Sequence, residues 1–150
     1  MRISIKCSSA VHILLMIAEL SPTTKVTSEL LASSIGSNPV EIRKLLGNLK
    51  NAGIVTIVRG TGGATLTIDP KQISLFDIYS AVDSNSLDSL IGVHMHPSKQ
   101  CPFGKNISQL LSEPYTQIGN AVKDTMISIT LDQLIARLYE IDPSFKHSLL

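Results

Sequence analysis

The first third of the chain carries apolar residues at helical spacing, divided into three segments by turn-forming residues. In the first segment, residues 7–20, the apolar positions follow the i, i+3, i+4, i+7 pattern of one helical face. They are Val11, Leu14, Leu15 and Ala18. Pro22 ends this helix. A shorter second helix is predicted over "SELLASSIG" (28–36), with Thr27 or Ser28 as its cap and Gly36 closing it.

The third segment, "SNPVEIRKLLGNLKNAG" (37–53), has the clearest helix start in the chain. Asn38 is a preferred N-cap residue, Pro39 suits the first helical position, and Glu41 is placed to reach back toward the cap. The apolar stripe consists of Ile42, Leu45, Leu46 and Leu49. The opposite face holds Val40, Lys44, Gly47 and Asn51, with Arg43 and Asn48 on its flanks. This face is therefore polar and partly basic.

A β-hairpin is predicted next. The runs "IVTIV" and "ATLTI" are rich in β-branched residues, and "RGTGG" (59–63) between them supplies residues that tolerate the positive φ of a tight turn. After Pro70, "SLFDIYSAV" predicts a fourth helix. Its inward face consists of Leu75, Ile78, Tyr79 and Val82.

The remainder of the chain is predicted as a loop followed by helix. Residues 83–105 have weak periodicity and several glycines and prolines, so we expect a loop, with a short helix near "LDSLIG". From about Asn106 the apolar pattern is helical again, with a break or restart expected at Pro114. "SITLDQLIARL" is either the continuation of this helix or a second helix capped by Thr130.

Composition narrows the class of protein. Apolar residues make up 43% of the 150 residues and charged residues 17%, which is typical of a folded domain. The longest apolar run, "VHILLMIA", is well short of the roughly 20 residues of a membrane span. The first 20 residues lack a signal-peptide cleavage site, so we expect a cytoplasmic protein with no membrane partner. The two cysteines, Cys7 and Cys101, are expected to be reduced thiols.

Charge is divided unevenly along the chain. Seven basic and three acidic residues give residues 1–60 a formal charge of +4, whereas six basic and nine acidic residues give residues 61–150 a charge of −3. A basic first part is expected where one part of a protein meets a polyanion.

Three helices followed at once by a glycine-tipped hairpin predict a winged helix-turn-helix. In this motif the third helix enters the major groove of DNA, and a basic wing, here with Arg59 at its base, reaches the neighbouring backbone or minor groove. A phosphate-binding enzyme loop is the alternative for "GTGGA". It lacks the P-loop lysine and the dinucleotide glycine spacing, and it leads into a strand and not into a helix N-terminus.

The stretch "LKNAGIVTIVRGTGGATLTIDPKQISLFDIYSAVD" (49–83) resembles the signature region of the Rrf2 family of bacterial winged-helix transcription regulators, which includes IscR, NsrR and CymR. The later segment "GVHMHPSKQCPFGKN" is most similar to the YwnA-type subgroup. The resemblance implies a mainly α fold with a small β-hairpin wing, and a homodimer in which long C-terminal helices cross between protomers. We expect residues 1–83 to form the DNA-binding domain, 84–105 a sensing or linker loop, and 106–150 the helical dimerisation region.

The resemblance also implies roles for particular residues. Asn38, Val40, Glu41 and Arg43 occupy positions that approach bases, and Arg59 is the wing arginine. A glutamate that reads bases in the best-known relatives is replaced here by Arg43, so the operator is expected to differ and to favour guanine. The full set of predicted DNA-contacting residues is Asn38, Val40, Glu41, Arg43, Lys44, Asn48, Arg59 and Thr61.

The sensing chemistry departs from that of the best-known relatives, which hold an iron–sulfur centre with three cysteines in the sensing loop. This chain has only Cys101 there, so no cofactor is expected. His94, His96 and Cys101 form a weak candidate metal site. A thiol switch is the sharper hypothesis, because Lys99 and Lys105 favour the thiolate of Cys101, and family geometry brings Cys7 of one protomer near the sensing loop of the other.

Two other classes of function stay open at this stage. An enzyme would use Cys101 as a nucleophile with His94 or His96 as base, but no residue that would orient the base is evident. A winged helix that docks other proteins without binding DNA is the second alternative. The favoured interpretation is a dimeric, sequence-specific DNA-binding repressor that is not an enzyme. Its expected signal is an oxidant that reacts with a thiol, and the alternative signal is a metal or small ligand.

Overall fold

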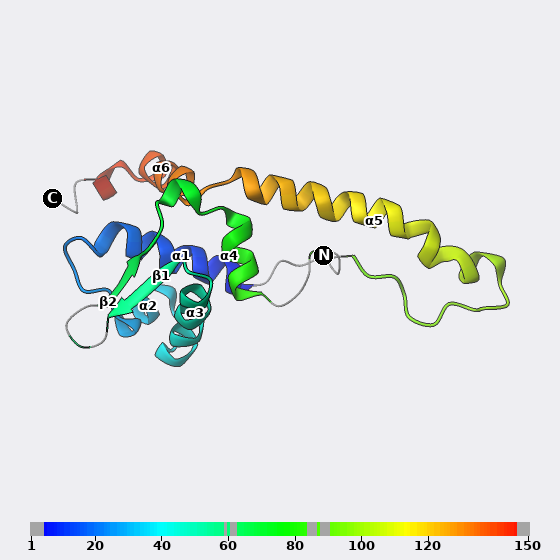
Figure 1. Ribbon diagram of the computed structural model, residues 1–150, viewed down its shortest axis with the longest axis horizontal. Coiled ribbons are helices and arrows are strands. Elements are labelled where there is room, and N and C mark those ends of the chain that lie inside the picture. Colours follow the sequence, from blue (N-terminus) through cyan, green and yellow to red (C-terminus); the bar gives the residue numbers. More distant parts are fainter. Residues whose placement is uncertain (1–4, 59, 61–62, 84–86, 88–90, 147–150) are drawn as a thin grey trace.

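The computed structural model describes residues 5–58, 60, 63–83, 87 and 91–146 of the chain. These residues form a rounded body and one long helix that projects from it (Figure 1). The elements in chain order are α1 (Ile5–Leu20), α2 (Ser28–Ile35), α3 (Pro39–Asn51), β1 (Val55–Val58), β2 (Gly63–Leu66), the 3-10 turn η1 (Pro70–Gln72), α4 (Leu75–Val82), α5 (Pro102–Ser128), α6 (Leu131–Ile141) and the 3-10 turn η3 (Pro143–Lys146). The predicted mainly α fold with a hairpin wing is confirmed.

Helix α1 lies at the centre of the body, in contact with α2, α3, α4, α6 and β2. Its buried face consists of Cys7, Ala10, Ile13, Leu14 and Ile17. The predicted face is therefore wrong in part, because Val11, Leu15 and Ala18 are only half-buried. Helix α1 is apolar on nearly every side, and periodicity alone does not select the side that meets the core.

Helices α2 and α3 begin as the sequence predicts. The Thr27 hydroxyl accepts a hydrogen bond from the Leu30 amide at 3.2 Å, and the Asn38 side chain accepts one from the Glu41 amide at 3.0 Å. Both caps satisfy amides that have no partner inside the helix. The predicted stripe of α3 is confirmed, because all four of its apolar residues are buried: Ile42, Leu45, Leu46 and Leu49.

The hairpin pairs β1 with β2 in antiparallel register, with Val55 opposite Leu66 and Val58 opposite Gly63. It is attached to the segment before α2, since the Ala64 amide donates to the Val26 carbonyl at 3.0 Å. Gly63 has φ +124°, and a Cβ atom there would lie 3.0 Å from the backbone nitrogen and oxygen of Val26. Only glycine fits this close approach, which fixes the wing against the body.

Helix α4 follows the prediction for "SLFDIYSAV". Ser74 caps it in a reciprocal capping box with Asp77. Ile78, Tyr79 and Val82 are buried, whereas Leu75, which was also predicted to face inward, is only half-buried. The short helix expected near "LDSLIG" (87–92) falls in part on residues 88–90, which lie outside the described part of the chain.

Helix α5 differs from the prediction at two points. It begins at Pro102 and not near Asn106, and it continues through Pro114 to Ser128 without a break. Pro114 lies at an exposed position, where water can satisfy the carbonyl that loses its helical partner. At 27 residues, α5 is about 40 Å long. In the described part of the chain no helix is long and apolar enough to cross a membrane.

Helix α6 is a separate helix capped by Thr130, which decides between the two alternatives for "SITLDQLIARL". The turn between α5 and α6 is joined to the body by backbone groups. The Leu75 amide donates to the Ile129 carbonyl and the Leu131 amide to the Ile73 carbonyl, each at 2.8 Å. We call this pair of hydrogen bonds the backbone bridge.

Candidate nucleic-acid interface

The outer face of α3 carries six of the residues predicted to contact DNA. Asn38, Val40, Glu41, Arg43, Lys44 and Asn48 are all exposed. The Asn38 side-chain oxygen is occupied by the cap, while its amide group stays available to a partner. The structure therefore presents these six residues together on one surface, at and after the start of the helix.

Two of these residues pair with each other. Glu41 does not reach back to the cap as expected; its carboxylate contacts the Lys44 ammonium at 2.8 Å. This hydrogen bond, together with the charge of Lys44, lowers the pKa of Glu41. Lys44 is thus partly neutralised on the face that would meet DNA.

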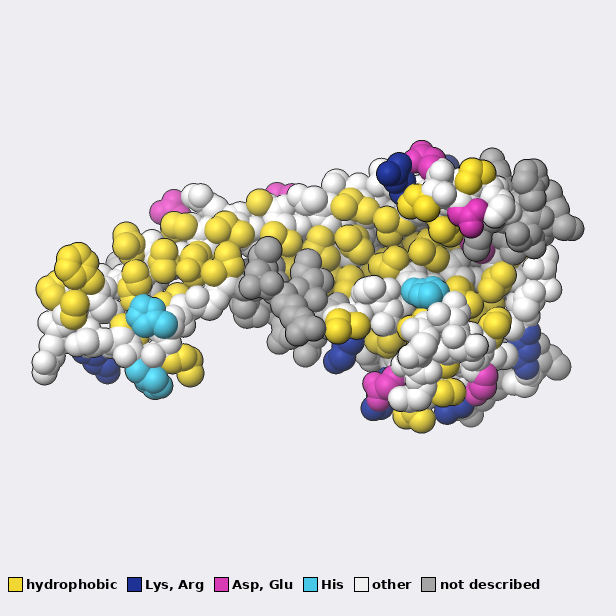
Figure 2. All heavy atoms as spheres, turned by 180° about the vertical axis from the view of Figure 1, so that it is seen from behind, with side chains coloured by type: hydrophobic (Ala, Val, Ile, Leu, Met, Phe, Trp, Pro, Cys, Tyr) yellow, Lys and Arg dark blue, Asp and Glu magenta, His cyan; other side chains and the backbone are white. Residues whose placement is uncertain are grey.

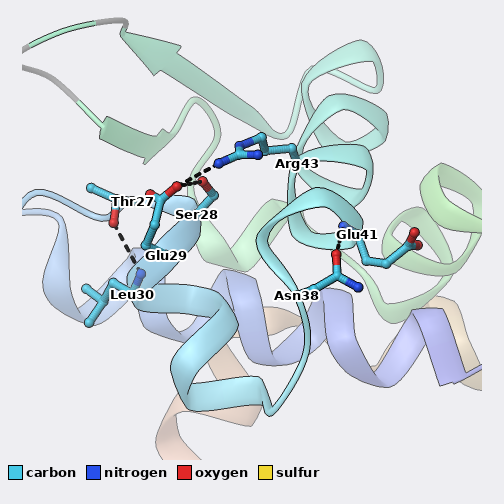
Figure 3. Close-up of polar contacts among 7 residues, drawn as sticks. All are labelled: Thr27, Ser28, Glu29, Leu30, Asn38, Glu41 and Arg43. Atoms are coloured by element: carbon cyan, nitrogen blue, oxygen red, sulfur yellow. Dashed lines mark hydrogen bonds and ion pairs between the residues drawn. The ribbon is translucent and has the colours of Figure 1, made fainter.

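Arg43 pairs with a residue that the sequence analysis missed. Its Nη2 atom donates to Oε1 of Glu29, in the first turn of α2, at 2.7 Å (Figure 3). The pKa of Glu29 is lowered by the hydrogen bond from its own backbone amide and then by the bonds from Arg43 and Ser28. The two residues are 14 positions apart, so the contact depends on how α2 packs on α3, which no local pattern reveals.

A cleft of about 410 Å³ separates α3 from the wing. Arg43 and Glu29 lie on one side of it, Val58 and Gly60 on the other, and Gly47 leaves room between them. Lys25 enters the same cleft and donates to the Gly60 carbonyl at the wing tip. Lys25 is a second residue that sequence reasoning missed. The predicted wing residues Arg59 and Thr61 lie outside the described residues.

The two cysteines have opposite surroundings. Cys7 is buried at the base of α5 with Tyr79, Leu87 and Met126. Burial raises the pKa of the Cys7 thiol, and the charge of Asp83 raises it further. Cys101 is exposed at the N-cap of α5 and forms no capping bond with its side chain. Because Cys7 packs near Met126, the two cysteines of one chain lie roughly 37 Å apart along the helix.

The candidate metal ligands are not brought together within one chain. His94 and His96 are exposed in the segment before α5. Among the described residues, no three His, Cys, Asp or Glu side chains are placed to hold a metal ion. Cys101 is the only thiol at this end of the molecule, so the residues do not fit an iron–sulfur cluster, which needs about four ligands.

Comparisons with known proteins identify the family. The model of the Rrf2 family, described as an iron-dependent transcriptional regulator, matches residues 3–137. The chain belongs to the Rrf2 family. The candidate HTH-type transcriptional regulator YwnA of Bacillus subtilis is 35% identical over 137 residues, which cover 91% of this chain and 99% of YwnA. The expected resemblance to the Rrf2 family, and to YwnA within it, is confirmed.

Solved structures agree with this assignment. A candidate transcriptional regulator from Lactobacillus plantarum is 27% identical, with a TM-score of 0.74 and 96% of each chain covered. The oxidized form of Staphylococcus aureus CymR is 24% identical, with a TM-score of 0.66, and the match covers 90% of this chain and 96% of CymR; this likeness shows the fold alone.

The Rrf2 assignment also decides between an enzyme and a transcriptional regulator. The family model and YwnA both describe transcriptional regulators and not enzymes, so the expectation of a non-enzyme is confirmed. The chain is therefore a transcriptional regulator of the Rrf2 family.

Proposed function

We propose that this Rrf2 regulator is a homodimeric, sequence-specific DNA-binding repressor whose release from DNA is triggered by oxidation of Cys101. The observation that supports DNA binding is the outer face of α3, where the six predicted contact residues are all exposed and one of them, Arg43, lines the cleft next to the wing. In this proposal residues 1–83 bind DNA, residues 84–105 sense, and residues 106–150 dimerise. A small dimer seated on a promoter blocks polymerase without further machinery, which favours repression.

Dimerisation is supported by the surface of α5. On the face seen from behind, hydrophobic side chains follow the length of the projecting helix (Figure 2). Within α5, Phe103, Leu110 and Ile118 are exposed, and Ile107, Leu111 and Tyr115 are half-buried. A contiguous apolar stripe on a helix that leaves the body is expected to be covered by a partner. A second copy of α5, crossing antiparallel, is the partner that matches it in length and character.

The redox step is supported by the different surroundings of the two thiols. Cys101 is exposed at the N-terminus of α5, where a peroxide can reach its sulfur atom. A peroxide would oxidise the Cys101 thiolate to a sulfenic acid and be reduced to water or an alcohol. A symmetric antiparallel crossing would bring the start of one α5 toward the end of the other, where the partner's Cys7 lies. Attack by that cysteine would form a disulfide and release water; because Cys7 is buried and its pKa is raised, this second step requires Cys7 to become exposed and deprotonated first, whereas sulfenic acid formation at Cys101 does not.

A mobility-shift experiment tests this function. The purified protein is mixed with DNA from upstream of its own gene, reduced and then treated with peroxide, at two salt concentrations. Binding that weakens steeply with salt and is lost on oxidation supports the proposal. Cys101→Ser is expected to bind in both states, whereas Cys7→Ala tests whether a disulfide is needed.

The controls separate the parts of the proposal. If the wild type binds DNA equally well before and after peroxide treatment, the proposed thiol switch is wrong, while the proposed repressor function still stands. No salt-dependent binding to any DNA, by a folded protein, contradicts DNA reading and favours the docking alternative.

A small ligand is a second candidate signal. A groove of about 530 Å³ lies between α1 and α6, lined mainly by apolar residues that include Val11, Leu15 and Leu138. His12 and Ser34, which are joined by a 3.0 Å hydrogen bond, give it a polar end. If oxidation does not release DNA, this groove is the first place to search for an inducer.

A further inference from the structure

The ion pair between Glu29 and Arg43 joins the two helices of the helix-turn-helix at the surface proposed for DNA. Glu29 stands in the first turn of α2, and Arg43 projects toward it from α3 (Figure 3). The Ser28 hydroxyl also donates to Glu29 Oε1, at 3.1 Å. The Glu29 carboxylate thus accepts a hydrogen bond from its own helix, α2, and another from the Arg43 guanidinium of α3.

Stability of the fold does not explain this pair. Its side chains are 63% and 58% exposed, and ion pairs at such exposure contribute little to folding. A carboxylate beside the DNA-facing cleft also repels phosphate, so it weakens non-specific binding. The Glu29 carboxylate therefore neither stabilises the fold much nor attracts DNA. The remaining explanation is that it sets the orientation of the Arg43 guanidinium.

The geometry of arginine shows what that effect is. A guanidinium has five N–H donors in a planar fork, and Glu29 engages Nη2 alone. Donors remain for the O6 and N7 atoms of a guanine, which take two. A free guanidinium on this surface would instead turn toward the nearest phosphate, which offers oxygens at every base step.

We propose that Glu29 is a specificity-determining positioning residue, which holds Arg43 for a guanine edge and keeps it from the phosphate backbone. The inference rests on the proposed function and deepens it. Glu29 sets the base preference of a site that its own side chain does not contact. It also reduces the contribution of Arg43 to salt-dependent, sequence-independent affinity.

The test uses the full chain and a pool of random duplex DNA, with wild type, Glu29→Gln and Arg43→Lys. Selected sequences are compared, and affinities for the selected site and for the same site with one substituted base are measured at several salt concentrations. Glu140→Gln is the matched control, because Glu140 pairs with Arg137 at the same 2.7 Å and with similar exposure, 64% and 69%, on α6. Thermal unfolding checks that each variant folds.

Glu29→Gln is expected to lose about tenfold of the discrimination at one guanine position, near the lower end of the range for one bidentate contact. Its log affinity should fall more steeply with log salt, by about 0.9 for each phosphate that Arg43 gains. Arg43→Lys keeps the charge but lacks the planar fork, so it should lose the same discrimination. Glu140→Gln should match wild type in both measurements.

Other outcomes refute the inference at different levels. If Glu29→Gln binds the selected site more tightly with its discrimination intact, Glu29 merely inhibits binding and the positioning role is wrong. If Glu29→Gln matches wild type and Glu140→Gln, the pair is a surface contact without function. If wild type enriches no sequence at all, the proposed function itself fails, and this inference fails with it.

Discussion

Leu110 offers the sharpest test of the proposed dimer. Leu110 is 69% exposed on the apolar stripe of α5, so about two thirds of its surface is available to a partner. Burying a leucine side chain contributes about 1.5–3 kcal/mol. About two thirds of that surface is free in each copy and a two-fold interface contains the residue twice, so Leu110→Gln should weaken the dimer by about 2–4 kcal/mol, or roughly 30- to 10³-fold in Kd.

Sedimentation equilibrium of the full chain over a range of concentrations measures this loss. Ile141→Gln is the matched control, because Ile141 is 71% exposed at the end of α6 and away from the stripe. It should leave the dimer unchanged, and circular dichroism should show equal helix content in both variants. Equal dissociation constants for the two variants, or a wild type that stays monomeric at high concentration, would refute the reasoning.

Two further predictions concern stability. Gly63→Ala should lower the free energy of unfolding by about 3 kcal/mol, because a positive φ and a close approach to Val26 act together, whereas Gly60→Ala, which has open space, should lose about 1 kcal/mol; urea unfolding measures both. Tyr139 donates to Glu19, and this hydrogen bond raises the pKa of the Tyr139 phenol to about 12. The stabilising effect should therefore be complete below about pH 10, the usual phenol pKa, and be lost as pH rises toward 12, so Tyr139→Phe should flatten stability against pH in that window. An unchanged slope in the Phe variant would contradict this assignment.

Local signals in the sequence were enough to predict α3, the hairpin and α4. The cap at Asn38 and the four-residue apolar stripe of α3 depend on neighbours within one or two turns, and so does the capping box of Ser74 and Asp77. The same short-range signals also predict the polar face of α3, and with it most of the candidate interface.

What the sequence did not reveal depends on tertiary contacts. The core-facing side of α1 is chosen by the helices around it, since Val11 and Leu15 are as apolar as the residues that are buried. Glu29 reaches Arg43 only because α2 and α3 pack together, and Lys25 reaches Gly60 only because the wing folds back. The early start of α5 was hidden by glycines and prolines that suggested a loop.

The backbone bridge between residues 73–75 and 129–131 fixes the end of α5 that is nearest the body. A rotation of α5 by about 5° at this fixed end would move the far end of the ~40 Å helix by about 3.5 Å, roughly one base-pair step of DNA. Because the bridge is made of main-chain groups, substitutions there other than to proline are expected to leave its two hydrogen bonds in place. In the proposed dimer, the distance between the two DNA-binding domains should therefore be adjusted by bending within α5, and Pro114 is the position where this helix bends most easily.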